Sequence, residues 1–326
     1  MNQRPFTARG IPDLLDLVPA LFGFEPQESF IAITTHGDHS RFGFRLRLDI
    51  PPMRHVAAAA AQVAGHVRRQ DPDGVILLAL TERSQEADAL IAASAVLLDP
   101  VPVHEAVRCD GVSYWTYGPD GPDGPAPYSR HCSPVVAAAV LGGLPILPDR
   151  TTLVARFAEV SGERKVAMEL ATARVLDDAL HELAAGPRVH LGMAGLARLA
   201  PIIARHEAGE VLDDDDRATL AIWVSSKDVR DAVWSTFNRT NAETALRLWT
   251  DISQSVVDPF EASVLCLAAF AAWLSGDGTQ ALIAAERALA KEPDYEMGAL
   301  IMQLLDAGMS PSAWDGFDPE PPAMAA

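Results

Sequence analysis

The sequence has few lysines, few cysteines and no long hydrophobic run. Only three of its 26 basic residues are lysines, and 44 acidic residues give a formal net charge of −18. Binding to a phosphate backbone depends mainly on positive charge, so we expect no nucleic acid among its partners. The one local concentration of basic residues is Arg41, Arg45 and Arg47.

Cysteine usage and hydropathy exclude two further classes. Cys109, Cys132 and Cys266 are odd in number and include no CxxC pair, so neither a disulfide framework nor a structural zinc site is predicted. The longest apolar stretches, 135–147 and 264–274, are shorter than the roughly 18 residues that a membrane span requires. The first ten residues have no apolar signal segment. We therefore expect a cytoplasmic protein without membrane contact.

The sequence also lacks the common catalytic signatures. GxGxxG, GxxxxGK[ST], GxSxG and HExxH are all missing. These motifs mark dinucleotide sites, phosphate-binding loops, serine hydrolases and zinc proteases. We assign no catalytic residue and expect no cofactor, although an unfamiliar active site stays open.

The first half of the chain alternates strand and helix patterns. Residues 30–35 are apolar on both faces, and 42–50 alternate apolar with polar residues, so we expect an antiparallel hairpin with one half-exposed strand. The apolar run 75–80 is typical of a central buried strand. Helical spacing marks 11–24, 56–67 and 85–98.

Proline and glycine mark the breaks in these patterns. The first helix should bend or break near Pro19. Asp110-Gly111, between the strands 101–109 and 112–117, suits a two-residue turn in which both residues take a positive φ. Residues 118–127 hold four prolines and three glycines, which predicts an exposed loop.

The second half of the chain shows only helical patterns. We expect an α/β domain with a mixed sheet of about five strands over residues 1–148, an all-helical domain over 149–317 and a disordered tail over 318–326. Helical spacing marks 135–141, 152–157, 163–183, 194–206, 216–223, 227–237, 242–255, 261–274, 279–291 and 295–307.

A set of short motifs covers nearly the whole chain. The first half carries the opening signature, and Ser133-Pro134, Leu147-Pro148 and the final helical pair extend it. Together these motifs resemble the domain of unknown function 4192 family, an actinobacterial family. The resemblance implies no activity, substrate or catalytic residue. The opening motifs are Asp13-Leu14-Leu15, Val18-Pro19, Leu21-Phe22-Gly23-Phe24, Pro26, Glu28-Ser29 and Asp49-Ile50-Pro51-Pro52.

The last helical hairpin, residues 262–293, resembles a tetratricopeptide repeat. Gly276-Asp277 marks the turn, and Ala281 and Ala288 occupy small packing positions that should face the partner helix. Glu286 and Lys291 should lie on the solvated face. One repeat is too few for a continuous core, so the pair is either a helical cap or part of a peptide-binding groove.

A ligand of the α/β half should bind outside the carboxyl ends of its strands. This rule points to two threonines at the end of the first strand, and Asp49 alternatively caps the next turn. The residues so selected are Thr34, Thr35, Asp49, Thr81, Glu82 and Arg83.

Two clusters have metal-ligating side chains. His36, Asp38 and His39 lie in one short segment, but the composition of this segment favours a polar hairpin turn. The acidic run 213–216 precedes a helix pattern, where carboxylates cap the free backbone N–H groups. We predict a turn and a helix cap rather than metal sites.

Two function classes remain. Two sizeable domains and a repeat-like hairpin without a catalytic motif favour a non-catalytic cytoplasmic adaptor that binds another protein. The alternative is an enzyme or small-ligand sensor that uses the crevice at the strand ends of the α/β domain.

Overall fold

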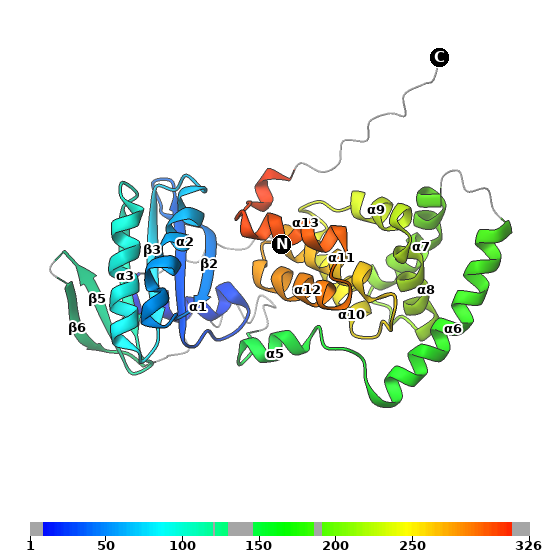
Figure 1. The fold of residues 1–326 in the computed structure, drawn as a ribbon, viewed down its shortest axis with the longest axis horizontal. Helices are drawn as coiled ribbons and strands as arrows, with labels where there is room; N and C mark the ends of the chain where they lie inside the picture. The colour runs from blue at the N-terminus through cyan, green and yellow to red at the C-terminus, as the bar shows by residue number, and fades with distance from the viewer. Residues whose placement is uncertain (1–8, 120, 130–145, 186–190, 315–326) are drawn as a thin grey trace, which may run out of the picture. The chain divides into compact units, whose positions relative to one another are not determined.

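The computed structural model describes residues 9–119, 121–129, 146–185 and 191–314. Its internal contacts divide the chain into two units, Met1–Thr152 and Leu153–Ala326. The first is a mixed β-sheet with helices and the second is helical, as the sequence predicts (Figure 1). The domain boundary expected at residue 148 stays a prediction. The helix expected at 135–141 and the tail 318–326 lie outside the described residues.

In the described part of the first unit, the sheet has six strands in the order β2-β1-β3-β4-β5-β6. Only β3 and β4 run parallel, and every other neighbouring pair is antiparallel. The expected hairpin of the first two strands is confirmed. The strands are β1 Ser29–His36, β2 Arg41–Asp49, β3 Gly74–Leu80, β4 Val103–Cys109, β5 Ser113–Gly118 and β6 Gly121–Pro127.

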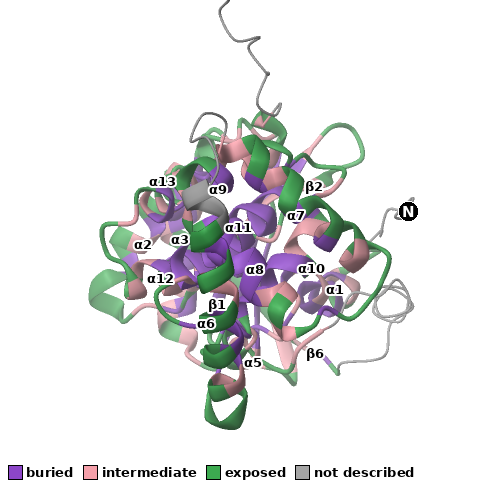
Figure 2. Cartoon of the chain, turned by 90° about the vertical axis from the view of Figure 1, so that its right-hand side faces the viewer, coloured by how far each residue is buried: buried purple, intermediate pink, exposed green. Residues whose placement is uncertain are grey.

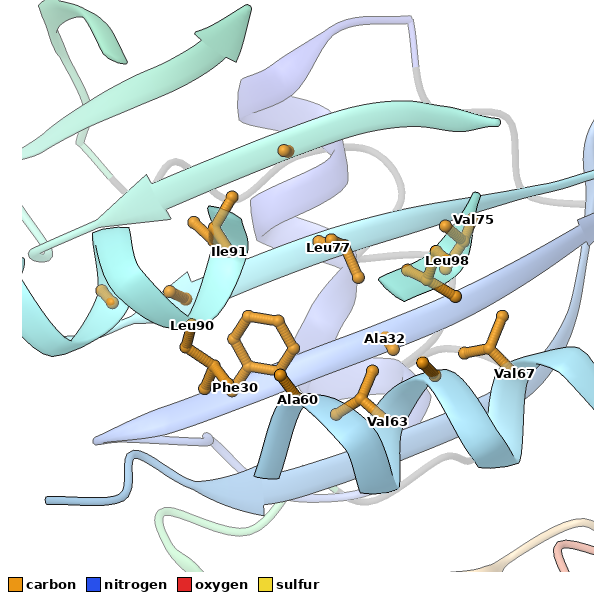
Figure 3. Packing of buried hydrophobic residues seen from close by; sticks show 14 of the residues in the cluster. Phe30, Ala32, Ala60, Val63, Val67, Val75, Leu77, Leu90, Ile91 and Leu98 are labelled. Atoms are coloured by element: carbon orange, nitrogen blue, oxygen red, sulfur yellow. The ribbon is translucent and has the colours of Figure 1, made fainter. Parts of the chain in front are cut away.

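Both faces of the central strands are buried because helices cover them. Phe30 and Leu77 pack with helices α2 (Val56–Arg68) and α3 (Ser84–Leu98), and α1 lies behind the sheet in Figure 3. A 3-10 turn, Met53–His55, leads into α2. Burying each large apolar side chain of this core contributes about 1.5–3 kcal/mol.

Helix α1 (Ile11–Phe22) continues through Pro19, so of the expected bend or break the break is wrong and the bend stays a prediction. Proline removes one backbone hydrogen bond, but Leu14, Leu15 and Val18 are almost fully buried and hold the helix in place. The helix ends at Gly23, whose φ of 73° is left-handed and favours glycine.

Strand β6 corrects the prediction of an exposed loop at 118–127. Among the described strands it pairs only with β5 and is the edge of the sheet, where a missing N–H donor is tolerated. Its residues are mostly exposed. Composition rich in proline therefore excluded a central strand but not an edge strand.

The hairpin between β4 and β5 is confirmed, but its turn differs from the expected one. Residues 110–112 form the loop, and only Gly111 has a positive φ, 97°. Asp110 Oδ1 accepts hydrogen bonds from the backbone N–H groups of Val112 and Ser113 at 2.9 and 2.7 Å. The aspartate side chain closes the loop, which is an Asx turn rather than a two-residue turn.

The described part of the second unit consists of helices around a buried centre. Figure 2 shows α8 and α11 buried, and all residues of α11 are buried. None of the described helices is long and apolar enough to cross a membrane. The helices are α5 Arg150–Ala155, which begins in the first unit, α6 Gly162–Ala185, α7 Leu191–Glu207, α8 Asp214–Ser225, α9 Lys227–Ser235, α10 Ala242–Ser253, α11 Glu261–Leu274, α12 Gly278–Lys291, α13 Glu296–Asp306 and the 3-10 turn Pro311–Ala313.

Helices α11 and α12 form the hairpin that the sequence predicted. Ala281 and Ala288 are fully buried, as expected of small packing positions. Lys291 is not on a solvated face, and that expectation is wrong. Its ammonium contacts Glu261 at 2.8 Å, Asp258 at 3.5 Å and Glu159. The sequence around Lys291 does not indicate these partners, because Glu261 and Asp258 lie about 30 residues earlier in the chain and Glu159 lies before α6.

Candidate functional site

The candidate residues at the strand ends fall into two separate groups. Strand β1 runs antiparallel to β3, so Thr34 and Thr35 pair with Val75 and Gly74 at the beginning of β3. Thr81 follows the other end of β3. The six residues therefore do not share one crevice, and whether any of them binds a ligand stays a prediction. Carboxyl ends of strands meet at one edge only when the strands are parallel.

At the first edge, the threonines are inside the protein. Thr34 and Thr35 are buried, and Thr34 Oγ1 lies 3.2 Å from His36 Nε2. The His36 ring covers Gly43, where an added Cβ would come within 2.6 Å of it. This edge presents the threonines to the protein interior rather than to a ligand.

The segment with His36, Asp38 and His39 forms the predicted turn between β1 and β2. The backbone N–H of Gly37 donates to Asp73 Oδ2 at 2.7 Å and holds this turn. In the part of the chain that the structure describes, no three histidine, cysteine or acidic side chains gather as a metal site.

At the second edge, polar side chains form hydrogen bonds with one another and with the backbone. Thr81 Oγ1 donates to the carboxylate of Glu28 at 2.9 Å and accepts from the backbone N–H of Arg83 at 2.9 Å. The Arg83 guanidinium donates to the carbonyls of Ile50 and Pro51 at 2.9 and 3.2 Å and to Glu86 at 2.7 Å. Arg83 therefore clamps the chain after β2.

The other polar residues near the end of β2 also have structural partners. Arg47 bonds Ser29 Oγ at 2.9 Å and Asp49 at 2.5 Å. Arg45 donates to the carbonyl of Leu21 at 2.9 Å. Asp49 and Glu82 are exposed. These arginines join strands and α1, so they do not form a free basic patch.

A cavity of about 360 Å³ lies elsewhere, between α6, α7 and α8 of the second unit. Figure 1 shows the long helix α6 beside α8, with α7 on the same side of the helical unit. Charged side chains dominate the lining, and apolar groups complete it. The lining residues are Val175, Asp178, Ala179, Arg198, Pro201, Ile202, Arg205, Asp213, Asp215, Asp216, Thr219 and Trp223.

The acidic run at the start of α8 positions this cavity. Asp213 Oδ1 accepts the backbone N–H of Asp216 at 2.8 Å, so the predicted cap is confirmed. The three following aspartates pair with arginines of the neighbouring helices. Asp214 binds Arg164 of α6 at 2.7 Å, Asp215 binds Arg174 of α6 at 2.6 Å, and Asp216 binds Arg205 of α7.

Asp216 occupies the centre of this arrangement. Its side chain is 13% exposed, and its hydrogen bond raises the pKa of Arg205 above the usual value. Asp216 Oδ2 is buried and accepts no hydrogen bond from any residue that the structure describes. A buried acceptor without a donor costs about 1–3 kcal/mol.

A family model covers most of the chain. The model described as "Domain of unknown function (DUF4192)" matches residues 12–312. The chain belongs to the DUF4192 family. No curated protein and no solved structure matches it.

In this DUF4192 protein the cavity can hold a small polar molecule by charge and hydrogen bonding. Carboxylates and guanidinium groups face it, while Ile202, Pro201 and the largely buried Trp223 supply apolar wall. The described lining contains neither histidine nor cysteine. Such a lining suits binding better than proton transfer or nucleophilic attack.

Sequence reasoning missed the cavity of the DUF4192 protein, although it identified part of the wall. The run 213–216 was visible as a helix cap. Its partner arginines are 11 to 50 residues away in the sequence. The one available signal was the number of acids, since a single carboxylate suffices for a cap.

Proposed function

We propose that this DUF4192 protein is a non-catalytic, cytoplasmic binding protein that holds a small polar ligand between α6, α7 and α8. The observation that carries the proposal is the cavity, whose volume of about 360 Å³ lies within the usual range for ligand sites. Helix α7 supplies arginines to its wall, and α6 and α8 supply aspartates. Cytoplasmic location is favoured by the small number of cysteines, three in the whole chain without a CxxC pair.

The ion pairs at the cavity also support binding rather than catalysis. Arg205 and Asp216 hold each other, which fixes both side chains before a ligand enters. A fixed wall lowers the entropic cost of binding. Neither partner of such a pair is a ready general base or nucleophile.

A metabolite extract separated into fractions tests this proposal. A fraction that contains the ligand should raise the melting temperature of the protein. Val175→Trp should abolish the shift because Val175 lines the cavity and the larger ring fills it. Val166→Trp is the matched control, since Val166 lies on the same helix, outside the lining, and is 56% exposed. The proposal fails if no fraction shifts the melting temperature, or if both variants keep the shift.

A second candidate function is the adaptor, in which the protein binds another protein. Three apolar residues of α6, Val166, Leu170 and Leu180, are each more than half exposed. The α11–α12 hairpin resembles a tetratricopeptide repeat, but α11 is buried along its whole length and cannot line an open groove. The exposed face of α6 is therefore the surface that favours this candidate.

A pull-down from native lysate tests the adaptor. Leu170→Glu should lose a specific partner, whereas Leu300→Glu, at an equally exposed position of α13, should keep it. Equal recovery by both variants would remove α6 as the docking surface.

A further inference from the structure

The charge of the cavity wall is not balanced. Among the residues that the structure describes, four aspartates and two arginines line the cavity, which leaves 2 − 4 = −2. Arg174 pairs with Asp215 at 2.6 Å from outside the lining and brings this to −2 + 1 = −1. The ion pairs of α8 therefore leave a net negative charge on the wall.

Asp215 and Asp216 each have an arginine partner, so the excess of negative charge lies on Asp178 and Asp213. Asp178 enters the lining from α6 and is exposed. A carboxylate favours a charged N–H donor, because charge-assisted hydrogen bonds are about twice as strong as neutral ones.

The rest of the wall accommodates the carbon skeleton of a ligand. Ile202, Pro201 and Trp223 line the cavity, and Trp223 is 8% exposed. Thr219 does not offer a free hydroxyl, since its Oγ1 donates to the carbonyl of Asp215 at 2.7 Å. An ammonium group on a short alkyl chain fits both the carboxylates and the apolar wall.

We infer that the ligand of the α6–α7–α8 cavity is a small organic cation that carries an ammonium group. This inference rests on the proposed binding function and adds the chemical class of the ligand. A dicarboxylate would face the excess of aspartates, and burial of an unpaired charge is strongly unfavourable. A zwitterion would be attracted to this wall by its ammonium group and repelled by its carboxylate.

Three four-carbon compounds of similar length test the inference by calorimetric titration. Putrescine carries two ammonium groups, 4-aminobutyrate carries one ammonium and one carboxylate, and succinate carries two carboxylates. We expect putrescine to bind at least tenfold more tightly than either of the others. Asp178→Asn should weaken putrescine at least fivefold, and Val175→Trp should abolish its binding, while Val166→Trp binds it as the wild type does.

Stronger binding of 4-aminobutyrate or succinate overturns the inference, as does the absence of binding by all three. Binding of putrescine that survives Val175→Trp also overturns it, because the cation then binds elsewhere on this acidic protein. The metabolite fractions keep the two proposals apart. Suppose that Val175→Trp abolishes the thermal shift caused by a fraction, but the protein shows no preference for putrescine. The proposed binding function then stands, and only the inference that the ligand is a cation is refuted.

Discussion

Lys291 offers a direct test of how the helical unit is held together. Its ammonium lies 2.8 Å from Glu261, which is 4% exposed, and also contacts Glu159 and Asp258. Lys291→Ala leaves the buried carboxylate of Glu261 with Arg287, at 2.8 Å, as its remaining cationic partner among the described residues. We expect the variant to be clearly less stable than the wild type.

The magnitude follows from the burial of the partners. Removing one member of a fully buried ion pair costs about 3–5 kcal/mol, and an exposed pair contributes about 0–1 kcal/mol. Lys291 is 23% exposed, and Arg287 still neutralises Glu261, so we expect a loss of about 2–3 kcal/mol. In a unit of this size the loss lowers the melting temperature by roughly 5–10 °C.

Denaturant unfolding followed by tryptophan fluorescence measures this loss, because five of the six tryptophans lie in the helical unit. Lys291→Arg keeps the positive charge and should recover most of the stability. Glu286→Ala, at an exposed position of the same helix, should change the free energy of unfolding by less than about 0.5 kcal/mol. Equal stability of Lys291→Ala and Glu286→Ala would refute the assignment.

Three further predictions concern the same unit. Ala288→Phe should cost about 1–3 kcal/mol by overpacking a fully buried position, and an unchanged denaturation midpoint would contradict close packing of α11 and α12. Gly195→Ala should cost a similar amount, about 1–3 kcal/mol, since its Cβ would lie 2.4 Å from the buried Val229. If the variant were as stable in urea as the wild type, α7 and α9 would not be closely packed at this position. Burial opposes the charge of Lys291, but hydrogen bonds to Glu159 and Glu261 hold its pKa above the usual 10.5, so its contribution is complete below pH 10.5 and is lost at higher pH. The stability difference between wild type and Lys291→Ala should therefore shrink as the pH rises above 10.5, and a difference that grows would contradict the ion pairs.

Periodicity predicted most of the fold because burial repeats along each element. The apolar run in β3 and the alternation in β2 placed two strands correctly. The same reasoning missed β6, since proline and glycine composition reports backbone preference but not the position of a strand in a sheet. Whether a proline-rich segment becomes an edge strand depends on a neighbour that offers hydrogen bonds.

The candidate site was less predictable because it depends on strand direction and on distant pairs. Thr34 and Thr81 both follow the ends of apolar runs, yet β1 and β3 run in opposite directions and separate them. The neighbours of Asp216 in the sequence indicate a helix cap, whereas its contact with Arg205 requires α7 to pack beside α8. Sequence patterns within a single helix do not indicate which helices pack together.

Hydrogen exchange with and without the stabilising metabolite fraction tests the location of the site most directly. Ligand in the cavity between α6, α7 and α8 should slow amide exchange in the segments around Val175, Ile202 and Thr219, and Val175→Trp should remove this protection. Protection centred on Thr81 and Arg83 at the sheet edge, or no protection in α6, α7 and α8, would contradict the proposed site.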